Sequence, residues 1–295
     1  MRVLHFTDLH LFRFPRVSSL LSKRLLGTAN LYLARRVDHF SERSIELLVQ
    51  AVLEQAPDVC VCTGDLTGMA SPAEFEDIRT LLGPILDRFP VYMVPGNHDV
   101  YTGGAARERR FEKTFGAWSG GGSYPALHRQ GELSLVGLDC ARPHPILASG
   151  ELPAAQLEGM ERLLASGELD DSFTILLLHY PLRDRHGAPY GSSTRHLVNA
   201  RELEAVLRAK PGVDLILHGH EHHGFRSQLE TPRGPIPIYD PGAGGRTCAP
   251  SRNDTAHFNI YTIQDRRLTA IERWALDGER FVEEPGGPYA GQAST

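Results

Sequence analysis

Short apolar runs alternate with amphipathic stretches along the first third of the chain. Residues 2–7, 58–63 and 91–94 are largely apolar and have the length of buried strands. Apolar residues recur every three or four positions between residues 45 and 53 and between residues 78 and 82, which predicts a helix after each of the first two strands. This alternation favours a parallel sheet built from right-handed crossovers.

The second half of the chain continues this alternation and then changes to a different pattern. Strands are predicted at 132–139, 173–178 and 213–217, with one helix opening at Pro153 and another over 202–207. Four later segments alternate apolar and polar residues like antiparallel strands: 224–230, 235–239, 256–263 and 267–274, with a hairpin around Gln264-Asp265. The whole pattern predicts a mixed α/β fold.

Composition indicates one large globular domain. The chain has 295 residues, of which 41% are hydrophobic, so it can bury a sizeable core. We predict a single domain over residues 1–284 and a flexible tail over 285–295. Four cysteines without a CxxC spacing fit a reducing compartment. With neither a signal-peptide core nor a long apolar run, we expect a cytoplasmic protein, soluble or peripheral at the inner face of the membrane.

Charge is distributed unevenly along the chain. The net charge is −5, which argues against binding double-stranded nucleic acid. Residues 11–37 contain six basic residues and no acid, so this part carries +6 and the rest of the chain carries −11. Leucines recur at helical spacing within it, so we treat 11–38 as an inserted basic amphipathic segment.

Two interpretations of this basic segment stay open. It is either a lid that packs on the domain with solvated arginines, or a surface that touches anionic lipid or a lipid-bearing substrate. The residues that would make such a substrate or membrane contact are Arg16, Lys23, Arg24, Asn30, Arg35 and Arg36.

Polar residues with metal-binding side chains follow the predicted strands. They are Asp8, His10, Asp65, Asn97, His98, Asp99, His179 and the histidines between 218 and 223. Ligands gather at the carboxyl ends of strands in parallel sheets. A set of nitrogen and oxygen donors without sulfur suits manganese, which we favour, or iron or zinc. The donors are too numerous for one open catalytic ion, so we expect two ions that share one bridging carboxylate.

Each of these motifs has an ordinary structural explanation when taken alone. Asp8-x-His10 resembles a turn with a cap, and Gly64-Asp65 by itself is uninformative. Asn97 and Asp99 also favour turns for backbone reasons. Their recurrence in order, each at the end of an apolar strand, is what favours a shared functional site.

Together the motifs resemble the five blocks of the calcineurin-like metallophosphoesterases. The matching blocks are Asp8-x-His10, Gly64-Asp65, Gly96-Asn97-His98-Asp99, His179 and Gly219-His220-x-His222. The resemblance implies a four-layer αββα sandwich of two mixed β-sheets flanked by helices. It also implies that Asp8, His10 and His222 hold one metal, that Asn97, His179 and His220 hold the other, and that Asp65 bridges them. His218 and His223 fall outside the pattern and are left as surrounding or surface residues.

The resemblance further implies hydrolysis of phosphodiester or pyrophosphate bonds by a metal-activated water. His98 is the catalytic candidate for protonating the leaving oxygen, because Asn97 is expected to face the metals instead. Asp99 would orient His98, or would only cap a helix.

Three hypotheses about the function follow. Lys23-Arg24-x-x-Gly27-x-x-Asn30, followed by Arg35-Arg36, resembles bacterial phosphoesterases that include UDP-2,3-diacylglucosamine pyrophosphatases, so a lipid-linked nucleotide is the first substrate hypothesis. The alternative is a soluble cyclic-nucleotide phosphodiesterase of the 3′,5′-cAMP type. The third is a non-catalytic module that binds a membrane surface.

Overall fold

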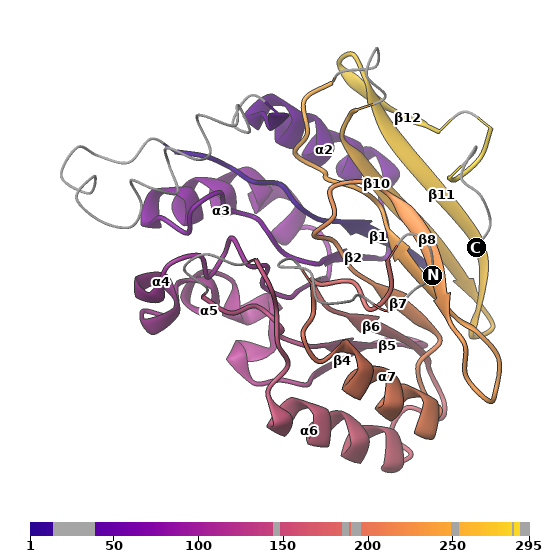
Figure 1. Ribbon diagram of the computed structural model, residues 1–295. Helices are drawn as coiled ribbons and strands as arrows, with labels where there is room; N and C mark the ends of the chain where they lie inside the picture. Colours follow the sequence, from indigo (N-terminus) through magenta and orange to yellow (C-terminus); the bar gives the residue numbers. More distant parts are fainter. Residues whose placement is uncertain are drawn as a thin grey trace.

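Two six-stranded mixed sheets pack face to face in the structure, a computed structural model, and helices cover their outer faces (Figure 1). The structure describes residues 1–13, 39–143, 148–184, 189, 196–248, 254–284 and 286–289. In the described part of the chain, no helix combines the length and hydropathy needed to cross a membrane.

The first sheet has the strand order β12-β11-β10-β1-β2-β3. Three parallel strands form one half of it: β1 (Arg2–Phe6), β2 (Val59–Cys62) and β3 (Val91–Met93). Three antiparallel strands form the other half: β10 (His257–Gln264), β11 (Arg267–Asp277) and β12 (Arg280–Glu283). A tight turn at Asp265 and Arg266, both with positive φ, joins β10 to β11 as the alternating pattern predicts.

The second sheet has the strand order β4-β5-β6-β7-β9-β8. Its four central strands run parallel: β5 (Leu133–Gly137), β6 (Phe173–Leu177), β7 (Leu215–Leu217) and β9 (Ile236–Asp240). The two edge strands are antiparallel to their neighbours: β4 (Ala126–Gln130) and β8 (Phe225–Leu229).

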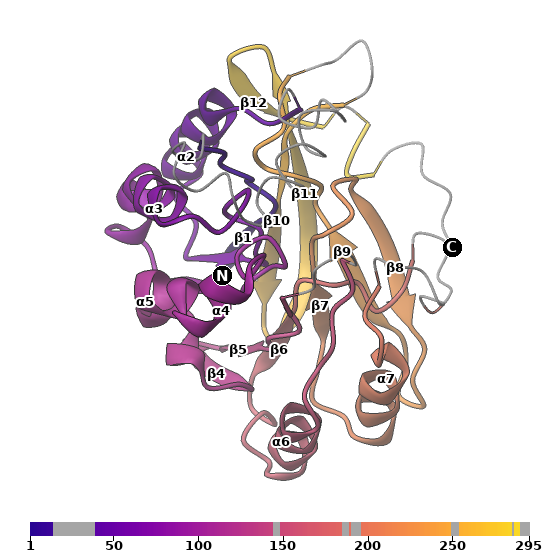
Figure 2. The same cartoon turned by 60° about the vertical axis from the view of Figure 1, so that its left-hand side comes forward.

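Helices lie on both outer faces of the sandwich. The first sheet is covered by α2 (Glu42–Gln55) and α3 (Pro72–Leu86), with the short helices α4 (Gly103–Arg107) and α5 (Arg110–Phe115) beside α3 (Figure 2). The second sheet is covered by α6 (Ala154–Ala165) and α7 (Ala200–Ala209). Two 3₁₀ turns follow α5, at Gly116–Trp118 and Gly120–Gly122.

Three separate apolar cores show how the strands divide their side chains. Leu4 and Phe6 of β1 pack toward α2 and α3, whereas Val3 points to the opposite face, because neighbouring residues of a strand alternate. That opposite face meets the second sheet, where Val3 packs in one cluster with Leu135 and Ile175. A third cluster joins the second sheet to α6 and α7. The predicted four-layer architecture is therefore confirmed.

The principal elements follow the predicted pattern, and the omissions are short. The strands β4 and β12 and the helices α4 and α5 were not predicted. The expected helical pattern between residues 17 and 32 lies outside the described residues.

The boundary at residue 284 stays a prediction, but one residue of the expected flexible tail is packed. Tyr289 is 3% exposed and donates its hydroxyl to the carbonyl of Asp240 at 2.8 Å, while the Arg273 guanidinium lies over its ring.

Candidate metal centre

The loops that follow β1 and β2 run side by side and bring their polar residues together. The backbone N–H of Asp8 donates to Gly64 at 2.9 Å, and that of His10 donates to Asp65 at 3.0 Å. The backbone therefore continues the sheet pairing beyond the strands themselves.

Five of the predicted ligands have a backbone that most residues avoid. Asp8, His10, Asp65, His220 and His222 all have positive φ, between 47° and 78°. This left-handed region is unfavourable for residues other than glycine, and such strain concentrates at functional sites. The fold thus holds the backbone of these five residues in a strained conformation while it brings their side chains together.

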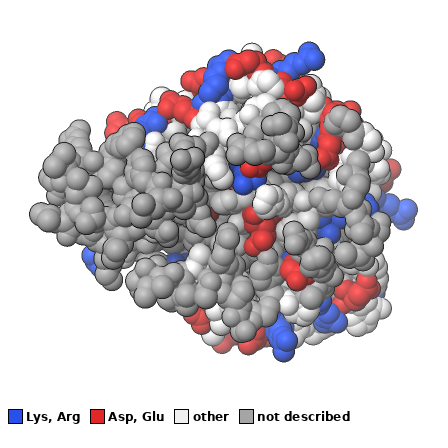
Figure 3. Space-filling model, turned by 45° about the horizontal axis from the view of Figure 1, so that its top comes forward, with Lys and Arg blue, Asp and Glu red and all other residues white. Residues whose placement is uncertain are grey.

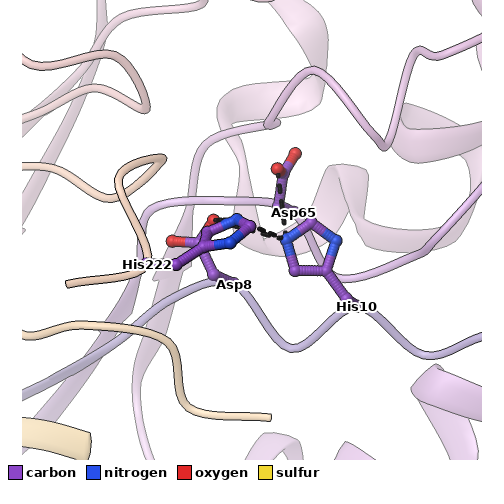
Figure 4. A group of neighbouring side chains, drawn as sticks. All are labelled: Asp8, His10, Asp65 and His222. Carbon is purple, nitrogen blue, oxygen red and sulfur yellow. Dashed lines mark hydrogen bonds and ion pairs between the residues drawn. The ribbon is translucent and has the colours of Figure 1, made fainter. Parts of the chain in front are cut away.

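One cluster contains Asp8, His10, Asp65 and His222, whose side chains converge from both sheets (Figure 4). His10 Nε2 lies 3.5 Å from Asp8 Oδ1 and 3.6 Å from Asp65 Oδ2. His222 Nε2 lies 3.3 Å from Asp8 Oδ1 and 2.9 Å from His10 Nε2. Four donor atoms therefore face one point.

A second cluster contains Asp65, His179 and His220. His179 Nε2 lies 3.3 Å from Asp65 Oδ2. The amide oxygen of Asn97 lies 3.1 Å from His179 Nε2 and 3.0 Å from His220 Nδ1, so Asn97 belongs to the same group of donors. Because Asp65 Oδ2 faces both clusters, it stands where a bridging carboxylate is expected.

Two buried oxygens show that these donors fit cations. Asp8 Oδ1 and Asp65 Oδ2 are buried and have no hydrogen-bond partner among the described residues. A buried carboxylate oxygen without a partner is costly, whereas a cation satisfies it. Together with the imidazole nitrogens, these oxygens form the nitrogen and oxygen donor set that Mn, Fe and Zn accept. The two clusters are consistent with a dinuclear metal site.

Electrostatics keep the two carboxylates ionised. Burial alone would raise the pKa of Asp65, but the imidazoles of His179 and His98 outweigh burial and hold this pKa below its usual range. Burial likewise opposes ionisation of Asp8, and the nearby imidazoles of His10 and His222 lower its pKa. Burial lowers the pKa of His179, yet the Asp65 carboxylate raises it more, to about 9. A cation bound here would replace that proton as the partner of Asp65.

His98 lies beside the metal clusters without joining them. Its backbone N–H donates to Asp65 Oδ1 at 2.7 Å, and its ring centroid lies 4.7 Å from that of His10. Its ring Nδ1 contacts the carbonyl of Gly68 at 2.7 Å, and Tyr101 stacks on the same ring at 5.4 Å. The position fits a group that acts on substrate rather than on a metal.

The hydrogen bonds of Asp99 in the described part of the chain go to neighbouring loops and not to the His98 ring, so its role in orienting His98 stays a prediction. Asp99 Oδ1 accepts from the backbone of Leu66 and Thr67, each at 3.0 Å, and its Oδ2 accepts from Gly96 at 3.0 Å. Its carboxylate therefore accepts hydrogen bonds from the loops after β2 and β3. The backbone carbonyl of Gly68, and not Asp99, contacts the His98 ring. Asp99 supports the site by joining these two loops.

His218 and His223 differ in their surroundings. His218 is fully buried, and its Nδ1 lies 3.4 Å from Asp240 Oδ2, outside both metal clusters. His223 is exposed. Gly219 precedes His220 because a β-carbon there would lie 2.1 Å from Thr7 Oγ1 and 2.4 Å from Asp8 Oδ2.

Two aromatic residues at the site were not predicted. The ring of Phe40 lies 4.5 Å from that of His10 and 5.4 Å from that of His222, and the ring of Phe12 stacks on His10 at 6.3 Å. No motif marks them, but Phe12 lies at the start of the basic segment and Phe40 lies just after its end. The candidate contact residues of that segment lie outside the described residues: Arg16, Lys23, Arg24, Asn30, Arg35 and Arg36.

Comparison with known proteins gives one family match and several relatives. The family model described as calcineurin-like phosphoesterase matches residues 1–224. A 3′,5′-cyclic-nucleotide phosphodiesterase from Nostoc sp. is 29% identical over 179 residues, which cover 58% of this chain and 58% of that protein. A "probable cyclic nucleotide phosphodiesterase" from Synechococcus sp. is 28% identical over 175 residues, covering 58% of this chain and 60% of the relative.

A solved structure supports the fold. A dimetal phosphatase from Danio rerio superposes with a TM-score of 0.60 at 13% identity, covering 96% of this chain and 98% of that chain. The two curated relatives described above bear names of cyclic-nucleotide phosphodiesterases and not of UDP-2,3-diacylglucosamine pyrophosphatases. The finer resemblance based on the basic segment is therefore not supported.

Proposed function

The chain belongs to the calcineurin-like phosphoesterases, and from this premise we propose that it is a metal-dependent phosphoester hydrolase that cleaves 3′,5′-cyclic nucleotides. The observation that carries this substrate class is the similarity to two proteins named as cyclic-nucleotide phosphodiesterases. The matched region covers 58% and 60% of the lengths of these relatives, so the substrate is our proposal for this chain. This proposal is incompatible with the third hypothesis, a non-catalytic membrane module.

The proposed division of work follows the two clusters. Asp8, His10 and His222 would hold one ion, Asn97, His179 and His220 would hold the other, and Asp65 would lie between them. When bound, the ions lower the pKa of a water and offset negative charge on the phosphoryl oxygens. The buried loops of both sheets hold these donors in place, so they would set the spacing of two bound ions.

His98 would act on the leaving group. Cleavage of a cyclic nucleotide breaks a bond between phosphorus and a ribose oxygen, and an alkoxide is a poor leaving group unless it is protonated. Water supplies the new bond to phosphorus, and the His98 ring supplies the proton that the ribose oxygen takes. A nitrophenolate leaves readily without that proton, which gives the role a simple test.

The lipid-linked nucleotide stays a second candidate because of one structural observation. The described chain ends its first stretch near Phe12 and resumes near Phe40, and both rings lie against His10. The basic segment is therefore attached at both ends beside the first metal cluster. Because this segment carries a charge of +6 in the sequence, it would attract a substrate that has an anionic or lipid-linked part. Cytoplasmic location and peripheral membrane contact stay predictions.

Charge on the described surface bears on other partners. On the face shown in Figure 3, acidic and basic side chains of the described residues are interspersed. Double-stranded nucleic acid requires a contiguous basic footprint, and the described residues of this face present none.

A substrate panel tests the proposal. Protein reconstituted separately with Mn²⁺, Fe²⁺ or Zn²⁺ would be assayed with cyclic AMP, cyclic GMP, bis(p-nitrophenyl) phosphate, p-nitrophenyl phosphate and vesicles of UDP-2,3-diacylglucosamine. We expect cyclic nucleotides to give the highest kcat/KM, with Mn²⁺ the favoured metal. Asp65→Asn is the matched control and should be inactive on every substrate. A preference for the monoester or for the lipid substrate would overturn the proposal.

A further inference from the structure

A backbone carbonyl determines which nitrogen of His98 carries the proton. Nδ1 of the ring lies 2.7 Å from the carbonyl oxygen of Gly68. A carbonyl oxygen can only accept a hydrogen bond, so Nδ1 is protonated, and Nε2 is the nitrogen that gains or loses a proton. The described residues form no hydrogen bond with Nε2. This nitrogen is therefore left for the substrate.

Gly68 is itself fixed between two loops. Its backbone N–H donates to the carbonyl of Leu11 at 2.9 Å, which ties it to the loop after β1. The neighbouring Thr67 donates its hydroxyl to the carbonyl of His98 at 3.2 Å. One local network of hydrogen bonds therefore holds both the Gly68 carbonyl that contacts the His98 ring and the backbone of His98 itself.

Phe12 occupies the space that a side chain at position 68 would need. A β-carbon built on Gly68 would lie 2.1 Å from Phe12 Cδ1 and 2.3 Å from Phe12 Cε1. The Phe12 ring also stacks on His10, with an angle of 12° between the planes. The Phe12 ring therefore packs directly against Gly68 and also against His10 of the first metal cluster.

We propose that Gly68 and Phe12 are a positioning pair that fixes the tautomer and direction of the His98 ring, so that Nε2 delivers the proton to the leaving oxygen. The inference rests on the proposed function, because it concerns the same site. In this step the phosphorus–oxygen bond to ribose breaks, the proton on Nε2 passes to the ribose oxygen, and the ring keeps its proton on Nδ1. Solvent then returns a proton to Nε2.

Three variants test the pair: Gly68→Ala, Phe12→Ala and the double variant. Gly68→Ala should lower kcat for cyclic AMP by about tenfold to a hundredfold, because a displaced proton donor loses rate steeply. The loss should be smaller with bis(p-nitrophenyl) phosphate, and KM and bound metal should not change. Phe12→Ala alone should lower kcat for cyclic AMP less than Gly68→Ala does. The double variant should recover most of the rate, because the space beside position 68 is then open.

Gly83→Ala is the matched control, since a β-carbon on Gly83 of α3 would meet nothing within 4 Å. It should retain wild-type kinetics. Wild-type kcat in Gly68→Ala, or a double variant as slow as Gly68→Ala, would overturn the inference.

A spectroscopic readout separates this inference from the proposed function. In zinc-loaded protein, the ¹⁵N shifts of the His98 ring, assigned by their loss in His98→Gln, should report a proton on Nδ1. Gly68→Ala should show a mixture of tautomers. A proton on Nε2 alone in the neutral wild-type ring would refute the positioning pair whatever the activity. If no phosphodiester is hydrolysed but Nδ1 carries the proton, the proposed function fails and the assignment of the ring stands.

Discussion

At the scale of single residues, His98 and Asn97 are neighbours with different tasks. Asn97 Oδ1 contacts two imidazoles of the second cluster, whereas the His98 ring contacts a backbone carbonyl. We predict that His98→Ala retains both metals and lowers kcat for cyclic nucleotides by about 10²–10⁴-fold, the usual contribution of a positioned proton donor. Turnover of cyclic AMP and bis(p-nitrophenyl) phosphate, with metal content from elemental analysis, measures this.

Asn97→Ala is the contrasting variant and should lose metal from the second cluster. Excess metal should restore part of its activity, while excess metal should not help His98→Ala. Equal metal loss in the two variants would contradict the separation of their roles.

Asp139 gives a residue-scale prediction that depends on pH. It lies just beyond β5, where its Oδ1 accepts from Ala141 at 2.9 Å and Arg142 lies 3.8 Å from its Oδ2. Burial raises the pKa of Asp139 from 3.8 to about 6 despite the nearby guanidinium. The folded state disfavours the ionised form, so protonated Asp139 contributes to the stability of the protein below pH 4. This contribution is lost as the pH rises through about 6.

Asp139→Asn stays neutral, so its stability relative to wild type should rise between pH 4 and pH 7.5 by at most about 3 kcal/mol. Urea unfolding of both proteins in EDTA measures this, since removing metal eliminates any change in metal affinity. A stability difference that is constant with pH would contradict the raised pKa.

At the scale of elements, Asp99 joins the ends of β2 and β3. Four donors meet its carboxylate, three of them backbone N–H groups from the two loops. We predict that Asp99→Ala lowers the free energy of unfolding by about 3 kcal/mol or more, because buried N–H groups lose their acceptor. Asp99→Asn keeps one acceptor oxygen and should lower the free energy of unfolding less than Asp99→Ala does. Urea unfolding of the metal-free proteins is the measurement, and equal losses in both variants would contradict this account.

The sequence predicted the elements that are long and regular enough to show an apolar period, and missed the very short helices and two edge strands. The strands β4 and β12 lie at sheet edges, where charged and polar residues interrupt the alternation. The helices α4 and α5 are five and six residues long, too short to show a helical period, and form by packing Ala105, Phe111 and Phe115 into the core around α3.

The site was predictable wherever a side chain carries the chemistry. The metal-binding side chains recur at strand ends, and parallel strands gather those ends at one edge. The partner of the His98 ring was not predictable, because every residue has a carbonyl and nothing in the sequence distinguishes that of Gly68. The contacts of Asp99 with the loops after β2 and β3 were not predictable, because adjacency in the sequence does not show which groups a side chain will meet.

At the scale of the whole molecule, charge is separated between the basic segment and the rest. We predict that replacing Arg16, Lys23, Arg24, Arg35 and Arg36 by glutamine weakens binding to vesicles containing phosphatidylglycerol, since each cation near an anionic surface contributes about 1 kcal/mol. Vesicle co-sedimentation measures this, with phosphatidylcholine vesicles as the control. Hydrolysis of cyclic AMP in solution should persist. If the wild-type protein does not co-sediment with anionic vesicles, the membrane interpretation of this segment is contradicted.

The metal site also connects the two sheets. Asp8, His10, Asp65 and Asn97 follow strands of the first sheet, whereas His179, His220 and His222 follow strands of the second. Ions held by both sets should resist separation of the sheets, because a ligand that binds only the folded state stabilises it. We predict that metal at a hundredfold excess over its dissociation constant raises the free energy of unfolding by about 2.7 kcal/mol per site.

Urea unfolding in EDTA and after addition of Mn²⁺ measures this stabilisation. Asp65→Asn should show a smaller increment, because it removes the oxygen that faces both clusters. His98→Ala should show the full increment, since its ring lies outside them. If metal binds by elemental analysis but leaves the unfolding midpoint unchanged, the ions do not join the sheets, and the strained loops hold their conformation without them.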